Sequence, residues 1–380
     1  MADIASTPDE HVIQALDNKI TAVRTNSLDF SFNELADMHS TGELVIRPEF
    51  QRLFRWPEGA QSRFIESLLL ELPVPPIFLI ERDDRIYELI DGLQRISSFL
   101  HFRGQLEKDG ELLEPLILSD CDIVPELNGY AHADLPRSLA IKLKRSYIRA
   151  EILRKESDPR LRYYMFKRLN TGGERLSEQE VRNATIRLLS NDFNLFIVEL
   201  SENPDFTYLT SIISDNARNK KFDQELVLRF LALKNDFDSY QHDVADFLTD
   251  YMEKVSDPDI LIDFDEQTER HVFTKTFKIF RLIADKLDTG PKIFGALGKA
   301  GEPRGQFSVY HYEGLTLGLQ AVLDQIDPEN PEHIDNLAAI VQSGKRDPDF
   351  LKHGGGGKNY RNPLRFRVEY FAERFKAVLA

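Results

Sequence analysis

The chain has 380 residues, of which 42% are hydrophobic and 29% are charged, and such proportions are typical of soluble globular proteins with two domains. No apolar run approaches the roughly eighteen residues that a membrane-spanning helix needs, and the first ten residues lack the basic and then apolar pattern of a signal peptide. We therefore predict a cytoplasmic protein that makes no contact with a membrane.

The charge of the chain is unevenly distributed. A net charge of -15 argues against a surface that coats nucleic acid throughout, because affinity for a polyanion comes from neutralised phosphates. Residues 137–175 nevertheless contain twelve Lys or Arg against four acidic residues, which predicts an anionic ligand in a local basic cleft. The single cysteine, Cys121, excludes an intramolecular disulfide, and its acidic neighbours predict a raised pKa.

The N-terminal half shows a mixed pattern of helices and strands after a lead-in over residues 1–30. Ser31 is the expected N-cap of a short helix over 32–38. Further along the chain, the apolar spacing and the breaks at Pro48 and Pro73 predict a strand over 44–46, a helix over 61–72 and a hairpin with strands over 77–80 and 85–90.

The second strand of this hairpin ends at Asp91-Gly92, and the apolar spacing from Ile96 to Phe102 predicts a helix that begins at about Gln94. We further predict strands over 112–118 and 148–153, a helix over 161–169, and a helix start at Ser177 with a capping-box pattern. The turn at Gly92 therefore joins the end of a strand to the start of a helix.

The C-terminal half is predicted to be mainly α-helical. Its amphipathic segments are 193–200, 224–233, 244–255 and 273–287, and a last helix is expected from about Pro363. We therefore predict an α+β chain with a lead-in over 1–30, a first domain over 31–185 and a helical domain over 186–380.

The Asp-Gly turn is the most informative candidate site. The N-terminus of a helix offers backbone N–H donors and the positive end of the helix dipole, which together suit a phosphate. Gly92 permits a close approach of the backbone, Asp91 is a candidate ligand for Mg²⁺, and Gln94 and Arg95 would lie beside the phosphate. The alternative, favoured by turn statistics alone, is that Asp91 only caps the helix.

Two other clusters contain cations that suit phosphates, and each has a structural alternative. Residues 47–56 place Arg47, Arg52 and Arg55 among aromatic side chains, which are equally typical of core anchors with solvated arginines. Residues 166–176 include Arg168 and a Gly pair, a pattern that also occurs where cations end a helix.

A resemblance connects these clusters. Gln51-Arg52, the prolines of 73–76, Asp91-Gly92-Leu93-Gln94-Arg95 and the stretch 166–180 follow one another in an order that resembles the N-terminal domain family of the GmrS/GmrD-type restriction endonucleases. This family is a branch of the ParB/sulfiredoxin-like fold, and the resemblance extends over residues 44–185. Leu93 is a departure, because the family has glutamine there in its D-G-Q-Q-R motif.

The resemblance implies a nucleoside triphosphate as ligand, Mg²⁺ as cofactor, and a regulatory role in a restriction or anti-phage defence system. The leading hypothesis is therefore nucleotide binding with candidate Mg²⁺-dependent hydrolysis to the diphosphate and phosphate. The implied catalytic residues are Asp91, which also holds the metal, Gln94 and Arg95. The implied phosphate-binding residues are Gln51, Arg52, Arg55, Gly92, Arg168 and Asn170.

Two alternatives remain open from the sequence. One is a nucleotide or DNA sensor that does not hydrolyse its ligand and acts through a separate nuclease subunit, which Leu93 favours. The other is a ParB-like DNA nickase, which is disfavoured by the acidic net charge and by nine scattered histidines that form no nuclease metal motif. A homo-oligomer is a further candidate assembly.

Overall fold

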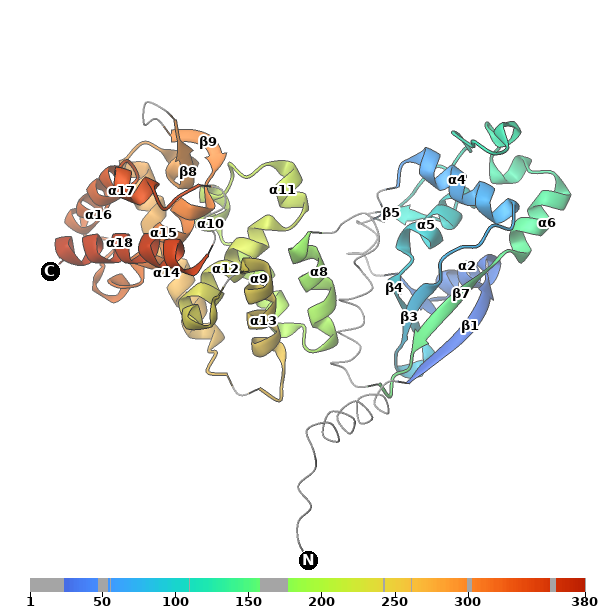
Figure 1. Cartoon of the computed structure of the whole chain (residues 1–380), viewed down its shortest axis with the longest axis horizontal. Helices are drawn as coiled ribbons and strands as arrows, with labels where there is room; N and C mark the ends of the chain where they lie inside the picture. The colour runs from blue at the N-terminus through green and yellow to red at the C-terminus, as the bar shows by residue number, and fades with distance from the viewer. Residues whose placement is uncertain are drawn as a thin grey trace, which may run out of the picture. The chain divides into compact units, whose positions relative to one another are not determined.

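The computed structural model describes residues 24–46, 54, 56–108, 110–157, 177–241, 243–260, 262–298, 303–355 and 360–379 of the chain. The chain forms two compact units, Met1–Arg175 and Leu176–Ala380, which we call the N-terminal and the C-terminal unit (Figure 1). The first unit contains a mixed β-sheet and the second is mainly helical, which confirms the predicted fold class. The likeness to a ParB fold stays a prediction.

The sheet of the N-terminal unit has five strands in the order β1-β7-β3-β4-β2. β1 is antiparallel to β7, β7 is parallel to β3, and β2 is parallel to β4. β3 and β4 form the antiparallel hairpin that the sequence predicts. The strands are β1 (Thr25–Ser31), β2 (Leu44–Val45), β3 (Ile77–Glu81), β4 (Tyr87–Asp91) and β7 (Tyr147–Leu153).

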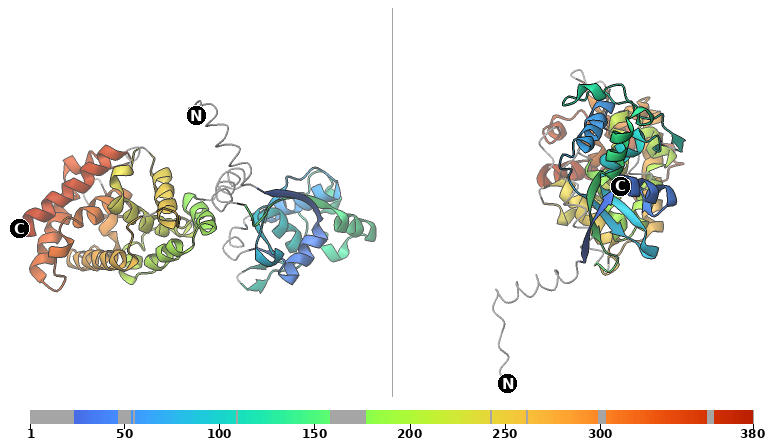
Figure 2. Two further views of the ribbon diagram at one scale, coloured as in Figure 1. Left: turned by 90° about the horizontal axis from the view of Figure 1, so that it is seen from below. Right: turned by 90° about the vertical axis from the view of Figure 1, so that its right-hand side faces the viewer.

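Four helices pack against one face of this sheet (Figures 1 and 2). They are α2 (Phe32–Thr41), α4 (Glu58–Leu69), α5 (Leu93–Phe102) and α6 (Arg137–Arg145). Alternate residues of β7, such as Ile148 and Ala150, point into the shared core because strand side chains alternate between the two faces. α2 begins at the predicted cap, where the Ser31 hydroxyl accepts a hydrogen bond from the Glu34 amide at 3.1 Å.

Three elements of the N-terminal unit differ from the sequence-based expectation. The predicted lead-in includes β1, yet all residues of β1 pair with β7; most of its side chains are exposed, so the strand carries no alternating apolar signal. α6 has no counterpart among the predicted elements. The predicted strand over 112–118 is wrong, because only Glu111–Leu112 form a strand, which pairs with Glu107–Lys108, while buried Leu116 and Leu118 pack from an irregular segment.

The helix predicted over 161–169 lies outside the described residues, as does most of the predicted lead-in. Both therefore stay predictions.

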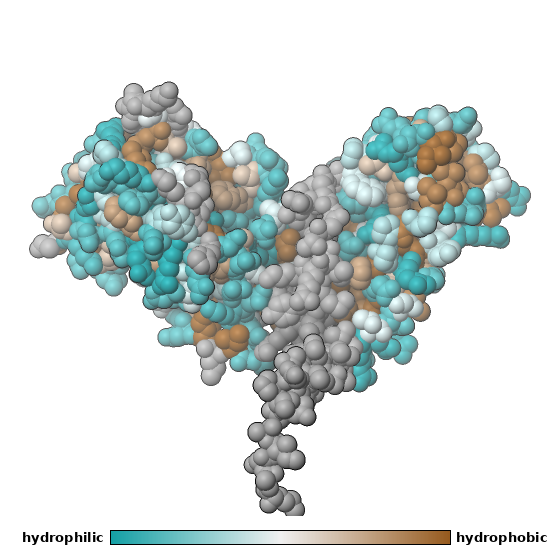
Figure 3. Space-filling model, in the orientation of Figure 1, coloured by the Kyte–Doolittle hydropathy of each residue, from teal (hydrophilic) through white to brown (hydrophobic). Residues whose placement is uncertain are grey.

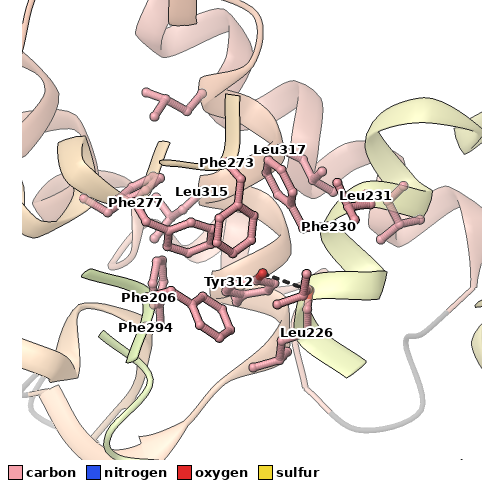
Figure 4. Close-up of a cluster of buried hydrophobic side chains, with 14 of the residues drawn as sticks. Phe206, Leu226, Phe230, Leu231, Phe273, Phe277, Phe294, Tyr312, Leu315 and Leu317 are labelled. Carbon is pink, nitrogen blue, oxygen red and sulfur yellow. Dashed lines mark hydrogen bonds between the residues drawn. The ribbon is translucent and has the colours of Figure 1, made fainter. Parts of the chain in front are cut away.

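The C-terminal unit surrounds a core rich in aromatic rings. Figure 4 shows Phe206, Phe273 and Phe277 packed together, and the hydroxyl of Tyr312 donates to the carbonyl of Leu226 at 2.9 Å. A small hairpin, β8 (Gly295–Leu297) and β9 (Pro303–Phe307), accompanies the helices. The helices are α8 (Glu178–Thr185), α9 (Asp192–Ser201), α10 (Pro204–Leu209), α11 (Asp215–Asn219), α12 (Phe222–Asn235), α13 (Val244–Ser256), α14 (Glu266–Lys286), α15 (Val309–Leu319), α16 (Pro331–Gly344), α17 (Pro348–Leu351) and α18 (Arg361–Leu379).

A group of buried charges links three of these helices. Glu313 of α15 lies 2.8 Å from Arg229 of α12 and 2.6 Å from Arg367 of α18, and all three side chains are almost inaccessible to solvent. Buried charges remain ionised only where they are paired in this way. The three side chains therefore fix the mutual arrangement of the three helices.

The division between the units falls before α8, whereas the sequence predicts a domain boundary after residue 185. α8 packs against α12 and α13, so it is part of the helical unit. It begins with the capping box expected at Ser177, whose hydroxyl and backbone amide both bond to Glu180. Among the described residues, no helix is both long and apolar enough to cross a membrane.

Candidate functional site

The turn between β4 and α5 has the strand-to-helix geometry that the sequence predicts. Gly92 is the N-cap of α5 with a φ of 106°, a left-handed conformation that favours glycine. A Cβ atom at Gly92 would lie 2.3 Å from Cγ2 of Ile77, so the space also demands glycine. Gly92 has no side chain with which to cap the helix, and the first intrahelical bond joins the Ile96 amide to the Gly92 carbonyl at 3.0 Å.

Asp91 does not cap α5 and forms an ion pair with Arg95 instead. Nη2 of Arg95 donates to Oδ2 of Asp91 at 2.7 Å, with 34% of the Asp91 side chain and 14% of the Arg95 side chain exposed. The capping alternative for Asp91 is therefore not what the structure shows. The carboxylate lies at the surface beside the start of the helix.

Arg95 also holds the proline-rich segment that precedes β3. Its Nη1 donates to the carbonyls of Pro75 and Pro76 at 2.6 and 2.8 Å. These residues precede the first residue of β3, Ile77, so their carbonyls lie outside the strand ladder and accept from a side chain. Arg95 therefore positions the Pro75–Pro76 segment and Asp91 together, a structural role that its place in the motif did not reveal.

A chain of hydrogen bonds attaches Trp56 to the start of α5. The Trp56 amide donates to Oε1 of Gln94 at 3.1 Å, and the Trp56 carbonyl accepts from Nε2 of Gln61 at 2.8 Å. Oε1 of Gln61 lies 2.8 Å from Nδ1 of His101, whose Nε2 lies 2.9 Å from the Glu114 carbonyl. The segment that follows Gln51, Arg52 and Arg55 is thereby held against Gln94.

His101 is the buried histidine of this chain of hydrogen bonds. The ring is almost fully buried, and desolvation lowers its pKa, against a smaller opposing effect of the Glu114 carbonyl. The contact of its Nδ1 with Oε1 of Gln61 helps to hold Gln61 in place. Sequence reasoning missed Gln61, because a polar residue on the buried side of α4 has no local signal of its partners.

The remaining predicted site residues lie outside the described part of the chain. These are Gln51, Arg52, Arg55, Arg168 and Asn170, and their phosphate-binding roles stay predictions. Leu93, which stands in place of the family's glutamine, packs partly buried against the N-terminal core. It brings an apolar side chain to the turn where the motif usually has a polar one.

The carboxylate of Asp91 is the candidate ligand for Mg²⁺ at the turn. Among the described residues, no group of three or more His, Cys, Asp or Glu side chains is arranged to hold a metal ion. Arg95 occupies Oδ2 of Asp91, and Oδ1 remains for a cation. This fits Mg²⁺ held by one carboxylate together with water and the phosphates of a nucleotide, and it does not fit an all-protein metal site.

Cys121 lies in the same unit as this turn and is buried. Burial raises the pKa of its thiol to about 11, and the carboxylates of Glu66 and Asp122 add to the increase. The expected increase in pKa is confirmed, and a thiol of this kind is inert at neutral pH.

Comparison with known families assigns the segment that contains the turn. Residues 32–187 match the family model of the GmrSD restriction endonuclease N-terminal domain. These residues belong to that domain family. The match includes β2 to β4, α5, α6 and the whole Asp91–Arg95 motif, so the resemblance inferred from the motifs is confirmed.

The GmrSD N-terminal domain identifies the chain as a protein of a restriction or defence system. The matched residues end within the 3-10 helix after α8, so nearly all of the helical unit lies beyond the match. No curated protein and no solved structure matches the chain significantly.

Proposed function

We propose that this protein binds a nucleoside triphosphate at the start of α5 and regulates a restriction or anti-phage system, with Mg²⁺-dependent hydrolysis of the bound nucleotide. The observation that carries the proposal is the N-terminus of α5, which follows a glycine in the left-handed conformation and a surface carboxylate. Such a helix start offers backbone donors and a positive dipole end to a phosphate.

The contacts around the turn suggest a division of roles. Asp91 would hold Mg²⁺ through Oδ1, while the backbone amides at the start of α5 would bind phosphate oxygens. Arg95 keeps Asp91 and the proline segment in place, and Gln94 keeps Trp56 beside the turn. Phosphoryl transfer to water depends mainly on charge neutralisation and positioning, which these groups and a bound Mg²⁺ would supply.

A second candidate function is a sensor that binds nucleotide without hydrolysing it and acts on a separate nuclease subunit. The packing of Leu93 against the core favours this alternative, because the side chain offers no hydrogen bond to an attacking water. The two candidates share one binding site and differ only in turnover.

The test measures both binding and phosphate release by the purified chain with each of the four nucleoside triphosphates and Mg²⁺. Trp56 is the single tryptophan and bonds to Gln94, so its fluorescence reports ligand binding at the turn. We expect Asp91→Asn to reduce phosphate release by about a hundredfold or more, the usual scale for the loss of one catalytic electrostatic group.

The matched control is Asp134→Asn, which removes an exposed carboxylate of the same unit away from the turn. Its release should equal that of the unaltered chain. Binding without release by the unaltered chain would select the sensor. Failure of all four nucleotides to bind would overturn both candidate functions.

A further inference from the structure

A groove of about 930 Å³ lies at the end of the sheet where β7 begins. Its walls are the end of α4, the Pro73–Pro76 segment, α6 and the first residues of β7. The volume is within the range of small-ligand and strand-binding clefts, and the groove is separate from the helix start at Gly92. It does share Pro76, whose carbonyl Arg95 holds.

The charges within the groove are mostly compensated. Lys142 lies 3.1 Å from Glu71, and Arg149 pairs with Asp29 through two hydrogen bonds of 3.0 and 3.1 Å. Arg145 makes no ion pair with any described residue and is exposed. The groove therefore carries one uncompensated positive charge from α6.

α6 carries further positive charge outside the lining of the groove. Its nine residues include four cations and no acidic residue, in a chain whose net charge is -15. Arg137, Ile141 and Arg145 are spaced four residues apart, which places them on one face of the helix, with Lys144 beside them. Neither Arg137 nor Lys144 forms an ion pair within the described ranges.

The rim also exposes apolar and aromatic surface. The Tyr147 side chain is 68% exposed at the start of β7, and Ile141 and Leu72 are about 40% exposed. Figure 3 shows that hydrophobic surface on the N-terminal unit adjoins hydrophilic surface. An exposed ring beside a row of cations is the pairing that single-stranded nucleic acids use, because unpaired bases stack while cations contact the phosphates.

We propose that this groove binds a single strand of nucleic acid, with Arg137, Lys144 and Arg145 on the phosphates and a base stacked on Tyr147. A duplex would offer phosphates to α6 but no open base face to Tyr147, and an acidic peptide would offer carboxylates without rings. The proposal goes beyond nucleotide binding at Gly92 and does not depend on it. It gives the basic cleft expected from residues 137–175 a specific location.

The test is fluorescence anisotropy with a labelled oligothymidylate of about 20 nucleotides and the full-length chain, without nucleoside triphosphate. The combined variant Arg137→Ala, Lys144→Ala and Arg145→Ala removes three exposed cations. We expect at least a tenfold loss of affinity at about 50 mM salt, and a decrease of about two in the dependence of log affinity on log salt.

Tyr147→Ala should weaken binding by about tenfold while leaving the salt dependence unchanged, because stacking releases no counterions. The charge-matched control combines Lys220→Ala, Lys292→Ala and Lys376→Ala, which remove exposed lysines of the C-terminal unit. This control should bind within about twofold of the unaltered chain.

Three outcomes would overturn the proposal. The first is no binding of the oligonucleotide by the unaltered chain. The second is an equal loss of affinity in the α6 variant and its charge-matched control. The third is equal competition by a polyglutamate peptide together with an unchanged affinity of Tyr147→Ala, which would assign the groove to an acidic protein segment.

Discussion

The N-terminal and C-terminal units both contain ion pairs at the surface, but among the described residues the fully buried pairs lie in the C-terminal unit. In the C-terminal unit, at most 7% of each side chain of Arg229, Glu313 and Arg367 is exposed. In the N-terminal unit, the pair of Arg95 with Asp91 leaves 34% of the carboxylate exposed. Buried pairs specify the packing of their own unit, whereas a carboxylate at the surface remains accessible to a ligand. Ligand chemistry is therefore expected in the N-terminal unit.

The two units can be followed separately in one unfolding experiment. Trp56 is the only tryptophan of the chain and lies in the N-terminal unit, so its fluorescence reports the unfolding of that unit. The far-ultraviolet circular dichroism of the chain is dominated by helices, most of which lie in the C-terminal unit. Fluorescence therefore follows the first unit and circular dichroism mainly follows the second.

The largest effect is expected for the buried charges of the C-terminal unit. Glu313→Gln removes the carboxylate from between Arg229 and Arg367, while Arg229 keeps its pair with Glu225, and the loss of this buried anion should lower the free energy of unfolding by roughly 3–5 kcal/mol. Glu329→Gln is the control, because Glu329 pairs with Lys278 at the surface, where the cost should be about 0.5 kcal/mol or less. Equal effects in urea unfolding followed by circular dichroism would contradict the difference between buried and surface pairs.

A smaller effect is expected at the turn of the N-terminal unit. Gly92→Ala combines an unfavourable left-handed φ with overlap between Cβ and Ile77, so the free energy of unfolding should fall by about 2–4 kcal/mol. Gly42 also has a positive φ, but a Cβ atom there would meet no atom within 4 Å, so Gly42→Ala should cost about 1 kcal/mol. Urea unfolding followed by Trp56 fluorescence measures both. A similar decrease in the free energy of unfolding for the two variants would show that the overlap of Cβ with Ile77 does not contribute at Gly92.

The last effect is a dependence of the stability of the C-terminal unit on pH. Burial lowers the pKa of Lys345 to about 7, and its ammonium group donates to the carbonyls of Ile293 and Gly295. Between pH 7 and the usual lysine pKa of about 10.4, the unfolded chain binds a proton that the folded chain lacks. Stability should therefore rise with pH across this window, by at most about 1.4 kcal/mol per pH unit.

Lys345→Met is the variant that isolates this effect, since it removes the titrating group and keeps an unbranched side chain. The rise in stability between pH 7 and pH 9.5 should be reduced in the variant, and this upper limit lies about half a unit below the usual tyrosine pKa. Measurements stop there because burial raises the pKa of Tyr240 to about 12, and such tyrosines destabilise the fold above pH 10. If the free energy of unfolding rose with pH as steeply in the variant as in the unaltered chain, the pH dependence would belong to other groups.

The parts of the fold that depend on apolar spacing and local capping could be predicted from the sequence. The β3–β4 hairpin, the start of α2 at Ser31 and the five helical segments predicted by range in the C-terminal unit have strong local signals, and the structure confirms them. β1 could not be predicted because its edge position leaves most side chains exposed, so its pairing with β7 has no counterpart in local sequence. Tertiary pairing alone makes it a strand.

The candidate site was predictable only in part, for a related reason. The position of Asp91 and Gly92 between strand and helix follows from the local pattern. The bonds of Arg95 to Pro75 and Pro76, and those of Gln61 to Trp56 and His101, join residues that are distant in sequence. A motif specifies the identity of such residues but not the partners that tertiary packing gives them.

The most direct test of nucleotide binding at the turn is an amide NMR spectrum of the nitrogen-labelled chain, recorded with and without nucleoside triphosphate and Mg²⁺. We predict that the amides of Leu93 and Arg95 move downfield, because they gain charge-assisted hydrogen bonds to phosphate. The amide of Ala245, which is already bonded to the side chain of its N-cap Asp243, should not move. Unchanged amides at the start of α5 under saturating nucleotide would contradict nucleotide binding at this turn.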